Sequence, residues 1–269
     1  MRDVIRVGRC FIFAAGDFYG LRERPAPGDF VIAADAGYRH CRAVGITPHL
    51  LLGDFDSMPE PDFHLNSNLN LNTQDTAYPK RLINLEKTAN PGRLIDLIDL
   101  KQNVNSENPP EIRDPALYPP HIERVPVEKD DTDTMLALKA GLSRGCDRFY
   151  IYGATGGKRF DHFIANLQGL LYLRRHGAKV FLYDKNFIWT VIQNEKLIIK
   201  REIENALLSI FACDGRAEGV NLSGVQYGLK NGVLTPEFPL GVSNHIAQAT
   251  ARVQVRKGAL LIGWEIIYK

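Results

Sequence analysis

Short apolar runs recur along the first part of the chain, and segments with helical spacing of apolar residues separate several of them. Runs of this kind occupy residues 10–14, 30–34, 50–52, 148–152 and 179–183. Helical patterns occupy residues 39–44, 132–144 and 160–176, and a glycine follows the first and last of them. Buried strands that alternate with helices predict an α/β fold, a mostly parallel, doubly wound sheet covered on both faces.

The pattern changes after Lys185, where helical periodicity ends. Short β-like runs at residues 188–192, 197–200, 207–211, 253–255 and 260–267 alternate with turn signals such as Asp214-Gly215 and Asn231-Gly232. Closely spaced strands with such turns predict an antiparallel β-sandwich. We therefore expect an α/β domain at residues 1–185 and a β-sandwich domain at residues 186–269.

Residues 65–122 interrupt the α/β pattern. This segment begins with an Asn-rich stretch at residues 66–72 and ends with a Pro-rich stretch at residues 108–120. Connections this long are uncommon inside a compact domain. We interpret residues 65–122 as an insertion into the α/β domain.

Composition excludes several classes of function. The net charge of +2 and the lack of a Lys/Arg run argue against a nucleic-acid partner. No apolar segment approaches the ~20 residues that span a bilayer, so we expect no membrane association. The four cysteines have neither zinc-site nor disulfide-framework spacing, which is typical of a cytoplasmic protein.

Two acidic clusters follow apolar runs. Asp54 and Asp56 come just after residues 50–52, and Asp130, Asp131 and Asp133 come just after residues 125–127. The carboxyl ends of strands are where open α/β sheets bind ligands, and carboxylate oxygens suit Mg²⁺ carrying a nucleotide phosphate. Aspartates are also common in turns and at helix starts, so for either cluster a purely structural role stays open.

A glycine-rich segment, residues 153–162, joins a predicted strand to the longer predicted helix. Gly156 and Gly157 allow backbone N–H groups to approach an anion, and Lys158 and Arg159 add positive charge. The segment does not match the P-loop pattern, and such turns are frequent in α/β proteins. His162, at the helix start, is expected to be structural.

Taken together, these motifs resemble the thiamine pyrophosphokinase family, also called thiamine diphosphokinases. The resemblance rests on Gly-Asp-Phe-Asp-Ser at 53–57, Asp-x-x-Asp-Thr from Asp130 and Gly-Ala-Thr-Gly-Gly-Lys-Arg-Phe-Asp-His at 153–162. Ala-Asp-Ala-Gly at 34–37 resembles a further family segment, and the match continues through residues 224–229 and 242–244. It implies a transferase (kinase) that moves pyrophosphate from ATP to the hydroxyl of thiamine, giving thiamine diphosphate and AMP.

The same resemblance implies roles for individual residues and a homodimer. Its thiamine site would lie at the subunit interface, between the β domain of one chain and the catalytic domain of the other. The implied catalytic and magnesium-binding acids are Asp54, Asp56 and Asp133. The implied ATP-binding residues are Asp35, Asp130, Gly156, Gly157, Lys158, Arg159 and Asp161. The implied thiamine-binding residues are Tyr227, Ser243 and Asn244, although residue statistics alone favour core packing for the tyrosine and a turn for the other two.

Two alternatives stay open. A related diphosphokinase acting on another hydroxymethyl heterocycle, such as a pterin, would use similar acids, but the β domain argues against it. A non-enzymatic nucleotide or metal sensor would not need a complete acid set, and this sequence contains one.

Overall fold

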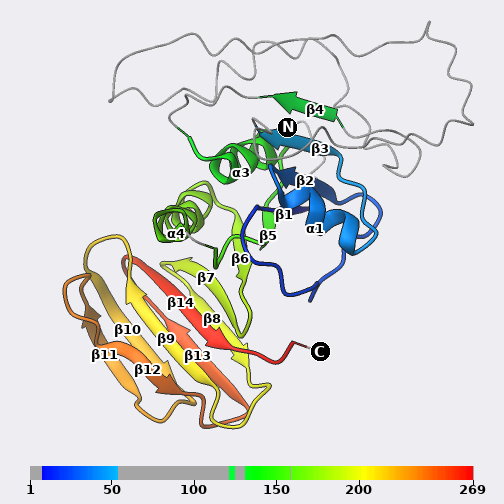
Figure 1. The fold of residues 1–269 in the computed structure, drawn as a ribbon. Helices are drawn as coiled ribbons and strands as arrows, with labels where there is room; N and C mark the ends of the chain where they lie inside the picture. Colours follow the sequence, from blue (N-terminus) through cyan, green and yellow to red (C-terminus); the bar gives the residue numbers. More distant parts are fainter. Residues whose placement is uncertain (1–7, 54–120, 125–130, 158, 269) are drawn as a thin grey trace, which may run out of the picture. The chain divides into compact units, whose positions relative to one another are not determined.

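The structure is a computed structural model that describes residues 8–53, 121–124, 131–157 and 159–268. Six strands of the first part pair in parallel (Figure 1). They are β1 (Arg9–Phe13), β2 (Phe30–Ala34), β3 (Leu50–Gly53), β4 (His121–Arg124), β5 (Arg148–Tyr152) and β6 (Lys179–Tyr183). In the described parts of the chain three helices accompany them, α1 (Gly37–Ala43), α3 (Asp133–Ser143) and α4 (Phe160–Arg175). The expected parallel α/β arrangement is confirmed.

The strand order reverses direction beside β1. Within the sheet the order is β6-β5-β1-β2-β3-β4, so the chain first builds outward from β1 on one side and later returns to its other side with β5 and β6. Ligands of open α/β sheets bind where the strand order reverses in this way, outside the carboxyl ends of the strands. In this chain that position lies between the ends of β1 and β5.

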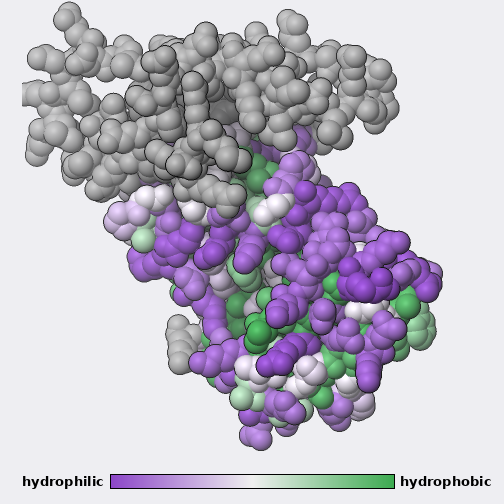
Figure 2. Space-filling view, turned by 180° about the vertical axis from the view of Figure 1, so that it is seen from behind, coloured by the Kyte–Doolittle hydropathy of each residue, from purple (hydrophilic) through white to green (hydrophobic). Residues whose placement is uncertain are grey.

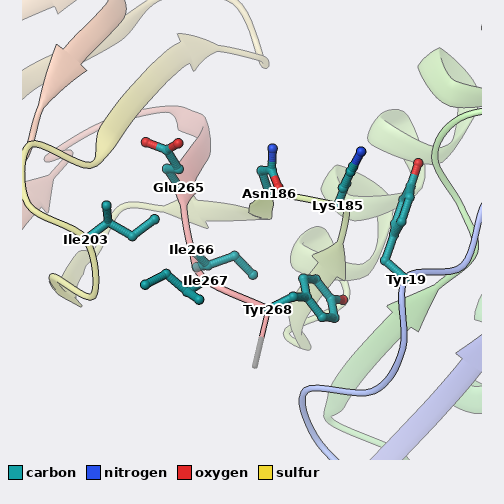
Figure 3. Close-up of a pocket in the computed structure, with 8 residues that line it drawn as sticks. All are labelled: Tyr19, Lys185, Asn186, Ile203, Glu265, Ile266, Ile267 and Tyr268. Atoms are coloured by element: carbon teal, nitrogen blue, oxygen red, sulfur yellow. The ribbon is translucent and has the colours of Figure 1, made fainter.

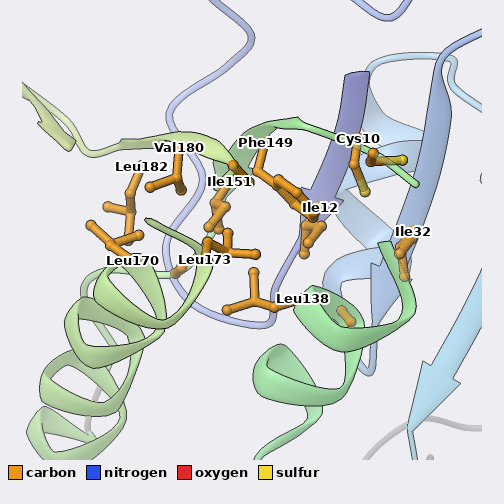
Figure 4. Close-up of a cluster of buried hydrophobic side chains, with 14 of the residues drawn as sticks. Cys10, Ile12, Ile32, Leu138, Phe149, Ile151, Leu170, Leu173, Val180 and Leu182 are labelled. Carbon is orange, nitrogen blue, oxygen red and sulfur yellow. The ribbon is translucent and has the colours of Figure 1, made fainter. Parts of the chain in front are cut away.

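Each face of the parallel sheet is covered by a separate apolar layer. On one face, Leu138 of α3 and Leu170 of α4 belong to the same buried cluster as Ile12 and Ile151 (Figure 4). The opposite face carries aromatic rings, and Tyr152 and Tyr183 stack there with ring centroids 4.6 Å apart. Alternate residues of a strand face opposite sides, so continuous apolar runs were needed to supply both layers.

β4 differs from the prediction. It begins at His121, inside the segment assigned to the insertion, and pairs in parallel with β3. The remainder of the predicted insertion, and the apolar run at 125–127, lie outside the described residues. The sequence His-Ile-Glu-Arg contains a single apolar residue, so no strand periodicity distinguishes it from its Pro-rich surroundings.

The sheet continues past Lys185. β7 (Phe187–Gln193) turns back antiparallel to β6, and β14 (Ala259–Glu265), β9 (Leu207–Ala212) and β12 (Gly241–His245) extend the same sheet. A second, four-stranded sheet has the order β11-β10-β13-β8 (Figure 1). Its strands are β8 (Lys196–Lys200), β10 (Ala217–Ser223), β11 (Leu229–Leu234) and β13 (Thr250–Gln254). Antiparallel pairing throughout this part confirms the predicted β architecture.

Two turn assignments in the β part are wrong. Asn231-Gly232 lies inside β11, where Asn231 has φ 50° and the pairing with β10 shifts register. A β-bulge uses the same positive φ as a hairpin turn, so the dipeptide signals either. Ser243 and Asn244 lie in β12 rather than in a turn. In the described residues, no helix is long and apolar enough to cross a membrane.

Candidate functional site

The carboxyl ends of β1, β2, β3 and β5 meet closely at one edge of the sheet. The Gly16 N–H donates to the Gly153 carbonyl at 2.6 Å, and the Asp35 N–H donates to the Leu52 carbonyl at 2.7 Å. A Cβ built on Gly53 would lie 3.1 Å from the Asp35 Cα atom. Asp35 itself has φ 48°, a left-handed conformation uncommon outside glycine. The predicted nucleotide-binding Asp35 is therefore located at this edge.

Three separate contacts fix the turn that follows β5. The Asn166 side chain of α4 donates to the Ala154 carbonyl at 2.8 Å. The hydroxyl of Thr155, which is 3% exposed, donates to Asp184 Oδ1 at 2.7 Å. The Asp17 N–H donates to the Thr155 carbonyl at 2.9 Å. Helix α4, the residue after β6 and the loop after β1 thus each hold one point of this turn.

Gly156 and Gly157 stand at the exposed end of the same turn. Both have positive φ, 69° and 72°, and a Cβ on Gly156 would meet the Asp17 carboxylate at 2.2 Å. Within the described residues, neither N–H donates a backbone hydrogen bond. Because α4 begins three residues later, at Phe160, its positive dipole end points to the same place. This arrangement fits an anion such as a phosphate.

Arg159 and Asp161 form an exposed ion pair at the start of α4. The Arg159 Nη2 donates to Asp161 Oδ2 at 2.6 Å, and Nε donates to Oδ1 at 2.9 Å. The hydrogen bonds from Arg159 lower the pKa of Asp161 to about 2. A phosphate bound at this turn would compete with Asp161 for the Arg159 guanidinium.

The predicted acids lie partly in the described region. Asp133 is the first residue of α3, and Thr132 caps that helix by accepting a 3.1 Å bond from the Met135 N–H. Asp131 forms a 2.5 Å ion pair with Lys139, so it is engaged within the chain. Asp54, Asp56, Asp130 and Lys158 lie outside the described residues, and within those that are described no group of three metal-ligating side chains is found.

The predicted thiamine-side residues do come together in the β part. Asn244 is 6% exposed, and its side chain both donates to the Tyr227 carbonyl at 2.7 Å and accepts from the Tyr227 N–H at 3.0 Å. The Tyr227 ring is 65% exposed, so core packing is excluded for it. Ser243, with φ 59°, is not part of this contact. Its N–H donates a 3.2 Å hydrogen bond to Ser209 Oγ.

A cavity of about 270 Å³ adjoins Tyr227 and Asn244. Apolar side chains from both sheets line it, including Ile210 of β9 and Leu222 of β10. Apolar side chains also reach the surface beside it, and Figure 2 shows such apolar areas among the polar surface of the molecule. The exposed ones that line this cavity are Tyr227, Leu240 and Val242, and Phe238, two residues before Leu240, is exposed as well.

The sequence did not single out Asp17, Asn166 or Asp184. Asn166 is 12 residues from Ala154, on the helix that follows the turn, whereas Asp184 is 29 residues from Thr155. Only the positions of Asp17 just after β1 and Asp184 just after β6 hinted at their proximity to β5. A prediction from strand order would have found them once β1 and β6 were known to flank β5.

Comparison with known proteins decides the family. The family model described as thiamin pyrophosphokinase, catalytic domain, matches residues 114–182. The model described as thiamin pyrophosphokinase, vitamin B1 binding domain, matches residues 195–260, and together the two cover half of the chain. The chain belongs to the thiamin pyrophosphokinase family. The family recognised from the motifs is confirmed.

Comparisons with individual proteins agree with this family assignment. The chain is 30% identical over 135 residues to thiamine pyrophosphokinase of Bacillus subtilis, a match over 50% of this chain and 63% of that relative. The crystal structure of the B. subtilis thiamine pyrophosphokinase matches with a TM-score of 0.68 at 22% identity, over 97% of this chain and 100% of that one. Thiamin pyrophosphokinase from Candida albicans matches with a TM-score of 0.60 at 13% identity, over 97% and 89% of the two chains. These structural likenesses support the fold.

Proposed function

We propose that this chain is a thiamine diphosphokinase that transfers pyrophosphate from ATP to the hydroxyl of thiamine. The observation that carries the proposal is the turn at residues 153–157, held by three contacts with two exposed glycines at the start of α4. Membership of the family supplies the substrates, and the vitamin B1 binding domain match favours thiamine over a pterin.

In the proposed reaction, the hydroxyl oxygen of thiamine attacks the β-phosphorus of ATP. A new P–O bond forms there, the O–H bond of the hydroxyl breaks and its proton is released to solvent, the bond from the β-phosphorus to the oxygen shared with the α-phosphate breaks, and AMP leaves with the electron pair. The N–H groups of Gly156 and Gly157 would bind phosphate oxygens, and Arg159 would add positive charge. Preorganised donors of this kind stabilise charge that develops on phosphate without reorganising during the step.

Magnesium is part of the proposal, with Asp54, Asp56 and Asp133 as its ligands and Asp35 and Asp130 facing the nucleotide. Its support is the parallel pairing of β3 with β4, which sets Gly53 opposite Arg124 at neighbouring strand ends. Asp54 directly follows Gly53 in the sequence, and Asp133 begins the helix after β4. When bound, Mg²⁺ would neutralise phosphate charge and orient the transferred group.

The thiamine side is proposed to consist of Tyr227, Ser243 and Asn244, in a homodimer whose two chains share each site. A flat cationic heterocycle suits the exposed ring of Tyr227, which Asn244 holds through two backbone bonds. The exposed apolar side chains of Phe238, Leu240 and Val242 support a second copy as the partner.

We also propose the domain division at Lys185 and a cytoplasmic location. The division is supported by the two family models, which match on either side of that residue. The location is supported by the four cysteines, none of which forms a disulfide.

A direct assay tests the function. Purified full-length protein with thiamine, ATP and Mg²⁺ should produce thiamine diphosphate and AMP in equal amounts. Formation of ADP would indicate transfer of a single phosphate, and no product with thiamine but product with a hydroxymethylpterin would refute the substrate. Activity should disappear with excess EDTA and fall by orders of magnitude in Asp54→Asn and Asp56→Asn. Near-normal turnover in both variants at saturating ATP and metal would refute the metal role.

A further inference from the structure

A second cleft, of about 490 Å³, opens at the same edge of the sheet, beyond β6. Its walls come from the loop after β1, the turn between β6 and β7, and the chain that follows β14. Figure 3 shows Tyr19, Lys185 and Tyr268 grouped at one end of the cleft, with Ile203 and Glu265 at the other. None of these residues has a role in the proposed site described so far.

The cleft is tied to the glycine turn through hydrogen bonds. The Tyr19 hydroxyl donates to Asp17 Oδ2 at 3.2 Å, and the Asp17 N–H donates to the Thr155 carbonyl at 2.9 Å. On the other side, the Thr155 hydroxyl donates to Asp184 Oδ1, and the next residue, Lys185, lines the cleft. Because β5 and β6 are neighbours, about 5 Å apart, the turn and the cleft lie within the reach of one nucleotide.

The side chains of the cleft suit a flat, polar heterocycle. Tyr19 and Tyr268 offer aromatic faces, Ile267 is an exposed apolar residue beside them, and Asn186 offers an amide. Burial raises the pKa of Tyr19 and raises the pKa of Tyr268 to about 12, so both hydroxyls remain protonated donors at neutral pH. Lys185 is exposed and can meet a phosphate or ribose oxygen at the end nearest the turn.

We propose that this cleft binds the nucleoside end of ATP, with the base against Tyr268 and the α-phosphate between Lys185 and the glycine turn. This rests on the proposed function, in which AMP is the leaving group. The acids predicted to bind the metal follow β3 and β4, on the opposite side of the turn from the cleft. The nucleotide would then lie along the edge of the sheet, from its base at β6 to its transferred phosphates near β3.

Binding of AMP to the full-length protein, measured by calorimetry without thiamine, tests the proposal. Tyr268→Ala and Lys185→Ala should each weaken AMP binding about tenfold, while inorganic pyrophosphate, which lacks a base, should bind Tyr268→Ala as it binds the wild type. Tyr268→Phe, which keeps the ring, should retain most of the AMP affinity. Tyr227→Ala, on the predicted thiamine side, is the matched control and should bind AMP normally.

Other outcomes separate this site from the proposed function. If Tyr268→Ala and Lys185→Ala both remain folded by circular dichroism and bind AMP with wild-type affinity, the cleft is not the nucleoside site. If Tyr268→Ala does not fold, Tyr268→Phe and Lys185→Ala provide the test. Base stacking is then contradicted if AMP affinity is unchanged in Lys185→Ala and falls tenfold in Tyr268→Phe. Wild-type protein that binds AMP in the cleft but forms no thiamine diphosphate would refute the function and leave the site standing.

Discussion

The hydroxyl of Thr155 donates a 2.7 Å hydrogen bond to the carboxylate of Asp184, joining the turn after β5 to the residue that directly follows β6. Thr155 is buried at the base of the glycine turn, and Asp184 is half-buried beside the second cleft. A hydrogen bond to a charged group is stronger than a neutral one, so this contact holds the turn more firmly than its backbone bonds alone. It is the physical link between the proposed phosphate site and the proposed nucleoside cleft.

Removing this hydrogen bond should weaken ATP use. Thr155→Val keeps the shape of the side chain but leaves Asp184 without its donor, at a cost of about 1.5–3 kcal/mol for a bond to a charged group. We expect kcat/KM for ATP to fall roughly tenfold or more, with KM for thiamine unchanged, and Thr155→Ser to restore it. A lower melting temperature with unchanged kinetics for ATP would show that the bond is structural only.

The closeness of the Asp17 carboxylate to Gly156 predicts that alanine substitution has different effects at two adjacent glycines. Both have positive φ, so alanine strains either one, but only at Gly156 would the Cβ meet a side chain, whereas Gly157 has open space around it. Gly156→Ala should therefore reduce kcat/KM for ATP far more than Gly157→Ala, and Asp17→Ala in the same chain should partly restore it. Steady-state kinetics with ATP varied checks this, and equal effects at both positions would contradict a role for Asp17.

The fold was largely predictable because its core strands are buried on both sides. The run at 30–34 is wholly buried and matches β2 without error, and β5 and β6 match the predicted ranges. Thr132 was a recognisable helix start because its hydroxyl caps α3. Half-exposed strands were harder, since β10 and β12 contain polar residues and glycines that resemble turns.

The site was predictable where its residues are adjacent in sequence and not where folding brings them together. Gly156 and Gly157 could be recognised from the segment that contains them, and Asn244 and Tyr227 from the family resemblance. Asp17 and Asp184 could not, because their position depends on β1 and β6 lying on either side of β5. Whether Asp54 and Asp56 join Asp133 stays a prediction, since both lie outside the described residues.

His40 should make stability depend on pH below neutrality. Its Nε2–H donates to the Gly16 carbonyl at 2.9 Å, its ring stacks on Phe18, and burial lowers its pKa from 6.5. The unfolded chain therefore binds the proton first, and the free energy of unfolding should decrease as the pH falls from 6.5 towards the lowered pKa. Asp17 opposes this shift and Arg39 adds to it.

The test for His40 is chemical denaturation between pH 5 and pH 8. His40→Gln should flatten the decrease below pH 6.5, although carboxylates will still contribute at the acidic end. The exposed His162→Gln is the matched control and should leave the slope as in the wild type. An identical slope in His40→Gln and the wild type would remove His40 from the explanation.

Substitutions at Tyr227 and Asn244 should distinguish an effect on thiamine binding alone from an effect on both binding and protein stability. Tyr227→Ala should raise the KM for thiamine roughly tenfold through a lost cation–π contact of about 0.5–2 kcal/mol and lost apolar contact, with ATP KM and melting temperature unchanged. Tyr227→Trp should be tolerated, because the larger tryptophan ring can make the same cation–π contact with thiamine. Asn244→Ala should both raise this KM and destabilise the protein by about 1–3 kcal/mol, because two backbone groups of Tyr227 lose their partner.

Mixing two impaired variants, assayed at a thiamine concentration far below the wild-type KM, should show whether two chains share one site. Tyr227→Ala damages the β part, and Asp133→Asn damages the α/β part. In a shared-site dimer, each mixed dimer contains one site with both parts intact. After co-expression with different tags, the mixture should recover about a quarter of wild-type thiamine diphosphate formation, because random pairing makes half of the dimers mixed.

Pairing Tyr227→Ala with Asn244→Ala is the matched control for that experiment. Both changes damage the β part, so every mixed dimer lacks an intact thiamine side, and its activity should stay at the level of the separate variants. Recovery of activity in this control would show that mixing restores activity for a reason other than a site shared between two chains. If the Tyr227→Ala and Asp133→Asn mixture shows no recovery although mixed dimers are isolated, then each thiamine site is formed within one chain. The exposed apolar side chains of Phe238, Leu240 and Val242 would then not belong to a shared thiamine site.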